Sequence, residues 1–134
     1  MTDWTELRAP SLDEFAVLAE AALAALPERF RKMAGDVVMR VEEFAEDEVL
    51  DELGVEDPFD LTGLYQGVDL RHRSLFDPLP RQSMVFLYRR PILDEWSHRG
   101  DVALGELISH VLVHEIGHHF GLSDADIEAI EAGA

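Results

Sequence analysis

The chain has 134 residues, of which 47% are hydrophobic and none is cysteine, and its formal net charge is −17 at pH 7. This length suits one domain with one modest core, so we expect residues 1–134 to form a single domain, with residues 1–10 as a loose leader. The charge disfavours a nucleic-acid partner, whose phosphates would be repelled. The lack of cysteine excludes disulfides and thiolate metal sites.

No N-terminal stretch combines a basic start, an apolar run and a small-residue cleavage site, and the longest apolar runs are short or interrupted. We therefore expect a cytoplasmic protein with no membrane partner. Acidic residues dominate from Val41 to Leu70, where there is no Lys or Arg, and arginines dominate the segment that follows. Acidic and basic surfaces that lie side by side explain this most simply. The alternative is that Arg89 and Arg90 orient an acidic peptide.

The first predicted element is a helix that follows Ser11 and ends or kinks at Pro27. Ser11 and Glu14 have the spacing of a capping box, and apolar residues recur at helical intervals after them. Proline then interrupts the backbone hydrogen bonds. A short turn of helix is expected next, through Met33, with Gly35 closing it.

Two strands and a loop-rich middle are predicted in the centre of the chain. Val37 to Phe44 is rich in β-branched residues and predicts a strand, and Ala45 to Leu53 predicts a short acidic helix. Asp57 to Gly67 contains two glycines and a proline and is interpreted as loop, followed by a short strand candidate at Val68 to Leu70. Ser83 to Tyr88 predicts the second strand.

The C-terminal third is predicted to be helical. Pro91 suits the first residue of a short helix through Trp96 that Gly100 ends. Asp101 is expected to cap a long helix to Phe120, and residues 124–132 predict a last short helix. Helices outnumber strands and do not alternate with them regularly, so the predicted fold class is α+β.

The long helix carries the sequence His114-Glu115-Ile116-Gly117-His118 inside an apolar run. Positions i and i+4 share one helix face, so His114 and His118 can direct a ring nitrogen at one metal ion. Glu115 lies about a hundred degrees round the helix. That offset suits a catalytic general base for zinc-bound water, whose pKa the metal lowers to about 7. The spacing therefore indicates a Zn²⁺ hydrolase site.

Two histidines hold zinc weakly, so a third ligand is needed. Gly121 favours the left-handed backbone that turns a chain at the end of a helix, and Asp124 follows in the pattern HExxHxxGxxD. A carboxylate oxygen of Asp124 could complete the site. Three protein ligands would leave the fourth position to water, which is the catalytic arrangement of zinc.

Other interpretations of these residues stay open. Asp124 also fits the first turn of a last helix, where acids favour the dipole, with Ser123 as N-cap and Asp126 in the capping role. His110 and His119 are rival donors. His119 points away from the face shared by the two motif histidines, and His110 is expected to be packed or hydrogen-bonded in the core.

Three stretches resemble the small zincin-like metallopeptidase family of bacteria, sometimes called minimal zincins. They are Leu61-Thr-Gly-Leu-Tyr-Gln-Gly67, Val85-Phe-Leu-Tyr-Arg-Arg-Pro-Ile92 and Val113-His-Glu-Ile-Gly-His-His-Phe-Gly-Leu-Ser-Asp124. The resemblance covers most of the chain from about Pro27 onward, and its last stretch is the most specific.

The resemblance implies a short mixed sheet packed on the active-site helix, with zinc held by His114, His118 and Asp124. It places the Ser83–Tyr88 strand close to the cleft. In zincins an edge strand beside the metal receives the substrate backbone, and the sequence leaves open whether this strand is central or at the edge. Larger zincins have a methionine turn beneath the metal. No methionine follows Asp124 here, which fits a minimal member.

The leading interpretation is a zinc-dependent metallopeptidase or related amide hydrolase that acts on a peptide or protein substrate. The small size motivates an alternative, a zinc-stabilised protein-interaction module with little or no activity, although Glu115 beside a ligand speaks against it. A metal-dependent nuclease is disfavoured by the acidic charge. Substrate identity and oligomeric state are left open.

Tyr65 is a candidate oxyanion stabiliser because it lies between two glycines and carries a hydroxyl donor. The alternative is a tyrosine that packs its ring in the core or in a lid. His98, in a polar stretch before the long helix, is a rival donor, with a surface histidine as its alternative.

Overall fold

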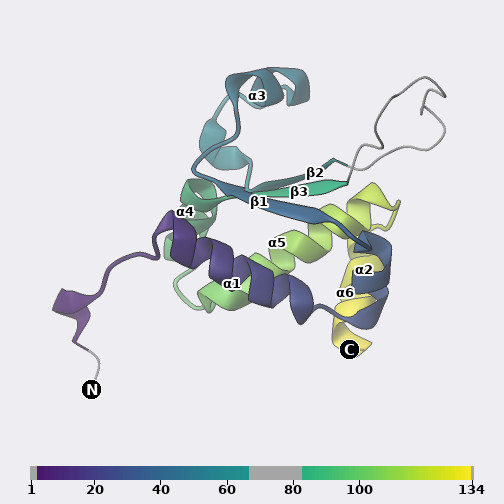
Figure 1. Ribbon diagram of the computed structural model, residues 1–134, viewed down its shortest axis with the longest axis horizontal. Coiled ribbons are helices and arrows are strands. Elements are labelled where there is room, and N and C mark those ends of the chain that lie inside the picture. The colour runs from purple at the N-terminus through teal and green to yellow at the C-terminus, as the bar shows by residue number, and fades with distance from the viewer. Residues whose placement is uncertain (1–2, 67–82, 134) are drawn as a thin grey trace.

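A mixed three-stranded sheet of order β1-β3-β2 forms the middle layer of the computed structural model, which describes residues 3–66 and 83–133. Strand β1 (Val38–Glu42) runs parallel to the central strand β3 (Met84–Tyr88), and β2 (Gly63–Gln66) runs antiparallel to it. Figure 1 shows α1 and α5 on one face of the sheet and α3 on the other. The predicted α+β class, with a short mixed sheet against the motif helix, is confirmed.

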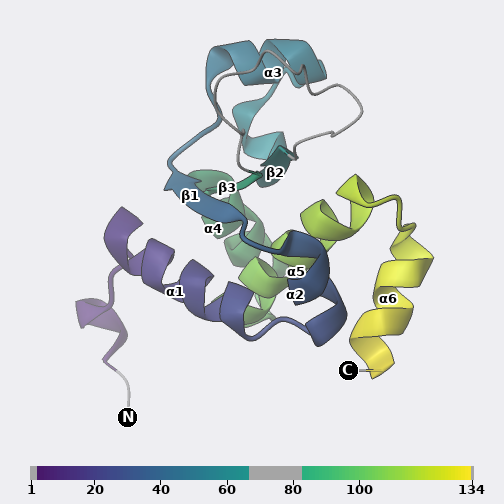
Figure 2. The same cartoon turned by 45° about the vertical axis from the view of Figure 1, so that its right-hand side comes forward.

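The helices divide between these two faces (Figure 2). Their bounds are α1 (Leu12–Ala24), α2 (Glu28–Ala34), α3 (Asp47–Leu53), α4 (Arg89–Arg99), α5 (Leu104–His119) and α6 (Asp124–Gly133). Two 3-10 turns, η1 (Trp4–Glu6) and η2 (Pro58–Asp60), complete the described elements. No helix in the described part of the chain is long and apolar enough to cross a membrane.

Alternation along β3 creates two hydrophobic clusters. Val85 and Leu87 face the larger cluster, which α1, α2, α5 and α6 share. Tyr88 and Phe86 face a smaller cluster beneath α3. Successive side chains of a strand point to opposite faces, so one short strand anchors both layers. The motif helix α5 therefore lies against the larger core.

The local start and stop signals are largely confirmed. The Ser11 hydroxyl accepts from the Glu14 amide at 3.1 Å and the Glu14 carboxylate accepts from the Ser11 amide at 3.0 Å, as the capping box requires. Gly35 follows α2 with φ of 56°, and Gly54 and Gly100 end α3 and α4 with φ of 68° and 73°. Glycine adopts this left-handed region without the steric cost of a Cβ.

Three predictions of local structure were wrong. The segment interpreted as loop contains β2, because pairing with β3 overrides its glycine content. Asp101 does not cap α5, which begins at Leu104 with Ala103 as its N-cap. Helix α4 begins two residues before Pro91, at Arg89. The strand candidate at residues 68–70 lies outside the described residues.

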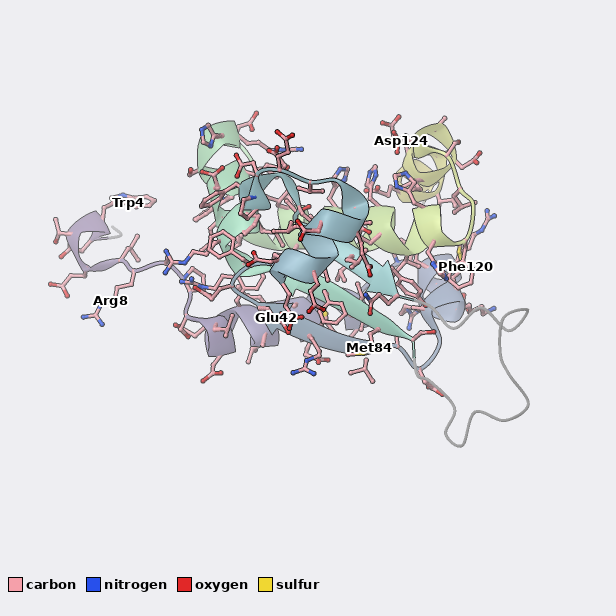
Figure 3. The ribbon with its side chains drawn as sticks, turned by 90° about the horizontal axis from the view of Figure 1, so that it is seen from above. Trp4, Arg8, Glu42, Met84, Phe120 and Asp124 are labelled. Carbon is pink, nitrogen blue, oxygen red and sulfur yellow. The ribbon has the colours of Figure 1, made fainter. Side chains whose placement is uncertain are left out.

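Among the described residues, Glu43 of the acidic segment pairs with Arg89 and Arg90 of the segment rich in arginine. Arg89 Nη1 lies 3.1 Å from Glu43 Oε1, and Arg90 Nε lies 2.8 Å from Glu43 Oε2. Arg89 Nε also donates to the Pro10 carbonyl at 2.7 Å, which ties the start of α1 to α4. The arginine pair is thus engaged intramolecularly. Figure 3 shows Trp4 and Arg8 further out, on an N-terminal arm that extends from the body.

Candidate metal centre

Helix α5 presents one face to the core and another to α6. Its buried positions fall at helical intervals and are Leu107, Ile108, Val111, Leu112, Val113, Ile116 and Gly117. His114 and His118 lie one turn apart on the face toward α6, and His118 is the more exposed, with 49% of its side chain accessible against 23%. The buried apolar residues hold α5 against the core. The position of the helix in turn orients the rings of His114 and His118.

Asp124, labelled in Figure 3, is the first residue of α6. It lies close to both motif histidines. Its Oδ1 lies 2.7 Å from His118 Nε2 and 3.5 Å from His114 Nδ1. One ligand atom from each of these three residues falls within 4.8 Å of the others. Tetrahedral ligands about 2.1 Å from one ion lie roughly 3.4 Å apart, so the cluster has a fitting size once the hydrogen bond to His118 opens slightly.

The turn between α5 and α6 delivers Asp124 to this position. Leu122 N donates to the Gly117 carbonyl at 2.9 Å and Gly121 N to the His118 carbonyl at 3.0 Å, which is the Schellman pattern. Gly121 has φ of 84°, as this motif requires. Ser123 and Asp126 then exchange hydrogen bonds of 3.1 Å. Asp126 therefore has the predicted capping role, and Asp124 is left facing the histidines.

Close packing between the two helices depends on Gly117. A Cβ at this position would lie 2.7 Å from Ile127 Cδ1, and Ile127 is fully buried. Only a residue without a side chain lets α6 approach α5 this closely. Gly117, the fourth residue of the HExxH sequence, thus sets the distance between α5 and α6. That distance determines whether Asp124 on α6 can reach the two histidines on α5.

The chemistry of His114 fits a metal ligand. Burial lowers its pKa, neighbouring His110 lowers it further, and Asp124 opposes the shift. The neutral imidazole, which is the form that binds metal, is therefore favoured near neutral pH. Its Nε2 is buried and has no hydrogen-bond partner among the described residues. An unsatisfied buried nitrogen is costly, and a metal bound at Nε2 would remove that cost, although the nitrogen that lies 3.5 Å from Asp124 in this structure is Nδ1.

Glu115 lies on the sheet side of the same helix turn. Burial raises the pKa of its carboxyl, while His118 and a hydrogen bond from the Tyr65 backbone amide pull it back. A Cβ at Gly63 would come within 3.3 Å of Glu115 Cγ and 2.9 Å of Val111 Cγ1, so β2 lies directly on this part of α5. The carboxylate is half-buried between the edge strand and the histidines.

Comparison with known proteins gives this geometry a family. A model of the zincin-like metallopeptidase family matches residues 34–134. The chain belongs to this family. Membership implies a divalent metal, usually zinc, and the histidines and acids described above offer candidate ligands for it. A search of curated protein sequences found no match to the chain.

In this zincin-like domain His98 and His119 belong to neither candidate ligand group. The His119 ring contacts the Tyr65 ring at 4.3 Å, and Phe120 contacts Tyr65 from a second side at 6.0 Å. The Tyr65 side chain is buried, so these contacts agree with a packed tyrosine, and its oxyanion role stays a prediction. His98 is on the surface of α4, where its Nδ1 lies 2.8 Å from the Asp94 carbonyl.

His110 corrects one expectation. It is not a core histidine, because 42% of its side chain is exposed and its Nδ1 lies 3.8 Å from Glu131 Oε1 on α6. The sequence did not predict Glu131 as a candidate ligand. The one feature that could have indicated it is its position two helical turns after Asp124. A regular α6 brings both acids to the same flank of α5.

The structure also decides whether the Ser83–Tyr88 strand is central or at an edge, which the sequence leaves open. The resemblance pointed to residues 83–88 as the strand near the cleft, but β3 is central and paired on both sides. Strands β1 and β2 form the two edges, and β2 is the edge strand that lies beside Glu115. The Tyr88 amide donates to the Thr62 carbonyl at 3.0 Å, so by alternation the backbone groups of Gly63 and Tyr65 point to the free edge. Among the described residues no strand pairs with that edge.

Proposed function

We propose that the chain is a zinc-dependent peptidase in which His114, His118 and Asp124 hold the metal and Glu115 is the general base. The convergence of the three ligand atoms, with Glu115 on the adjoining face, carries the proposal. A bound Zn²⁺ supplies a Lewis acid that polarises a carbonyl oxygen and lowers the pKa of water to about 7. A structural zinc site has no need of a half-buried carboxylate beside its ligands.

Glu115 performs the proton transfers in this proposal. Its carboxylate takes a proton from the attacking water and passes it to the nitrogen of the leaving amine. A pKa raised by burial brings the group closer to neutrality, where a base transfers protons most effectively. The Tyr65 amide fixes one side of the carboxylate and so orients it.

The substrate proposed is an extended peptide that adds to the free edge of β2. Gly63 directs its N–H and C=O to this edge and Tyr65 directs its C=O there, while the Tyr65 N–H donates to Glu115. A peptide paired with β2 would therefore pass beside the general base. The net charge of −17 favours peptides of basic character. Recognition through the backbone needs few specific side-chain pockets, which suits so small a domain.

Replacing Glu115 by Gln tests the function. Gln keeps the size and removes the base, so zinc binding should be retained while cleavage of a peptide library falls on the order of 10²- to 10⁴-fold. Glu106→Gln, an exposed acid in the first turn of α5, is the matched control. Unchanged cleavage in Glu115→Gln would refute its role. Wild-type protein that binds zinc and cleaves nothing would favour the interaction module.

The ligand role of Asp124 has its own test. Asp124→Ala removes one oxygen donor and should weaken zinc binding on the order of 100-fold, as measured by competition with a chromophoric chelator. Glu128→Gln changes an exposed acid on the same helix that lies in neither ligand group. Equal zinc affinity in the two variants would remove Asp124 from the ligand set.

A further inference from the structure

Helix α5 carries three histidines on the flank that faces α6. His110, His114 and His118 are spaced four residues apart, so they form one stripe. Helix α6 lies beside them with Asp124 near His118 and Glu131 near His110. Two possible ligand groups result, and His114 belongs to both. The proposed catalytic centre uses only the C-terminal half of this stripe.

The N-terminal half, formed by His110, His114 and Glu131, has the dimensions of a cation site. One ligand atom from each residue falls within 4.8 Å of the others. His110 Nδ1 lies 3.8 Å from Glu131 Oε1, which is too long for a hydrogen bond. Two ligands of one zinc ion, each about 2.1 Å away, lie at most about 4.2 Å apart, so this separation suits a shared ion. The His110 and His114 rings are 4.1 Å apart between centroids.

The surroundings leave two members of this group, His110 and Glu131, accessible to ions. His110 and Glu131 line an open pocket of about 490 Å³, together with Ser109, Glu106 and Arg99. Arg99 is the cation that would oppose a metal, but its Nε lies 3.3 Å from Glu95 on its own helix. Imidazole and carboxylate donors of this kind suit zinc, cobalt, nickel and copper more than magnesium or calcium.

We propose that His110, His114 and Glu131 form a second, weaker site for a divalent transition metal that competes with the catalytic site for His114. An ion bound there withdraws the His114 ring from the first ion, so excess metal inhibits the enzyme. The inhibition by excess metal rests on the proposed function, whereas metal binding by His110, His114 and Glu131 does not. The exposed flank of the pocket lets the second ion exchange readily with solvent.

A variant without the first site isolates the second. His118→Ala with Asp124→Ala removes two of the three proposed catalytic ligands and leaves His110, His114 and Glu131 in place. Calorimetric titration with Zn²⁺, and the absorption of added Co²⁺, should show one remaining equivalent. Adding His110→Ala or Glu131→Gln should weaken that binding on the order of tenfold or more. Adding His98→Ala, an exposed histidine outside both groups, should leave it unchanged.

Failure of the second site is separable from failure of the catalytic proposal. The proposal of a second site is wrong if the His118→Ala/Asp124→Ala variant binds no Zn²⁺, or if adding His110→Ala leaves its Zn²⁺ binding unchanged. Neither result contradicts the proposed peptidase function. Circular dichroism melts verify that each variant is folded before titration. In the otherwise unaltered enzyme, the zinc concentration that halves activity should rise at least several-fold in His110→Ala and Glu131→Gln. If the zinc concentration that halves activity is the same in both variants as in the wild type, the two sites do not compete for His114.

Discussion

Two neighbours of α5 shape the site in different ways. On one flank, α6 packs through Gly117 and brings Asp124 to 2.7 Å from His118. On the other, β2 packs through Gly63 and brings the Tyr65 amide to Glu115. The helix–helix contact therefore sets the proposed ligands, and the strand–helix contact sets the proposed base. Both approaches require a residue without a side chain at the point of contact.

The difference between the two flanks lies in exposure and in the source of rigidity. Asp124 is exposed, with 71% of its side chain accessible, and it is held by the turn that precedes it. Glu115 is half-buried and is held by a strand that belongs to the sheet. Metal affinity and proton transfer should consequently respond to separate mutations. Changes at Gly117 and Gly121 test the first flank, and a change at Gly63 tests the second.

Among changes at the three glycines, Gly117→Ala should have the largest effect. The new Cβ would lie 2.7 Å from Ile127 Cδ1 and 2.8 Å from Ile127 Cγ1, so α6 must move outward and carry Asp124 with it. We expect zinc affinity to fall on the order of tenfold. Overpacking should lower the free energy of unfolding by about 1–3 kcal/mol. The higher helix propensity of alanine should offset up to about 1 kcal/mol of this loss. Chelator competition and urea denaturation measure the two effects.

Two further variants sharpen this prediction. Gly105→Ala lies on the same helix with nothing within 4 Å of its Cβ, so it should stabilise the protein slightly and leave zinc affinity unchanged. Ile127→Val removes the Cδ1 atom nearest to the new methyl group and should restore part of the lost affinity in the double variant. Affinity that is equal in Gly117→Ala and Gly105→Ala would show that the contact between α5 and α6 does not position Asp124.

Gly63→Ala should damage turnover more than metal binding. Its Cβ would lie 2.9 Å from Val111 Cγ1 and 3.1 Å from the Phe86 carbonyl oxygen, which forces β2 away from α5. The Tyr65 amide then loses its position on Glu115. We expect kcat to fall on the order of tenfold with zinc affinity within about twofold of wild type. Pairing with Val111→Ala should recover part of kcat. A parallel loss of zinc affinity would mean that the two flanks are not independent.

The sequence predicts that His114 and His118 share one face of a helix, and the structure has this arrangement because the evidence for it is local. His114, Glu115 and His118 lie within five consecutive positions, and helix geometry alone places their side chains. Gly121 and Asp126 were interpreted correctly for the same reason, since a left-handed turn and a capping box involve only near neighbours. Their structures follow from backbone chemistry that acts over a few residues.

The features that escaped prediction are those that depend on distant partners. Strand β2 was interpreted as loop because Gly63 lowers strand propensity, whereas that glycine is what lets the strand rest on Val111 and Glu115. Likewise the sequence does not indicate that Gly117 faces Ile127. The sequence predicts a packed or hydrogen-bonded core histidine at His110, but 42% of its side chain is exposed and it lies near Glu131 of α6. Helical spacing predicts which residues share a helix face, but it does not predict which element of the fold packs against that face.

Gly121 provides the smallest test, one that acts through the backbone alone. Nothing lies within 4 Å of a Cβ at this position, and φ is 84°, so Gly121→Ala meets no clash but must adopt a left-handed backbone. Such a residue costs about 1–2 kcal/mol, which urea denaturation would detect. Gly121→Asn should cost less, because asparagine tolerates this region, and zinc affinity should change only a few-fold in either variant. If Gly121→Ala instead stabilises the protein as Gly105→Ala does, the turn that delivers Asp124 is not left-handed. The position of Asp124 would then depend on the α5–α6 contact without help from the turn.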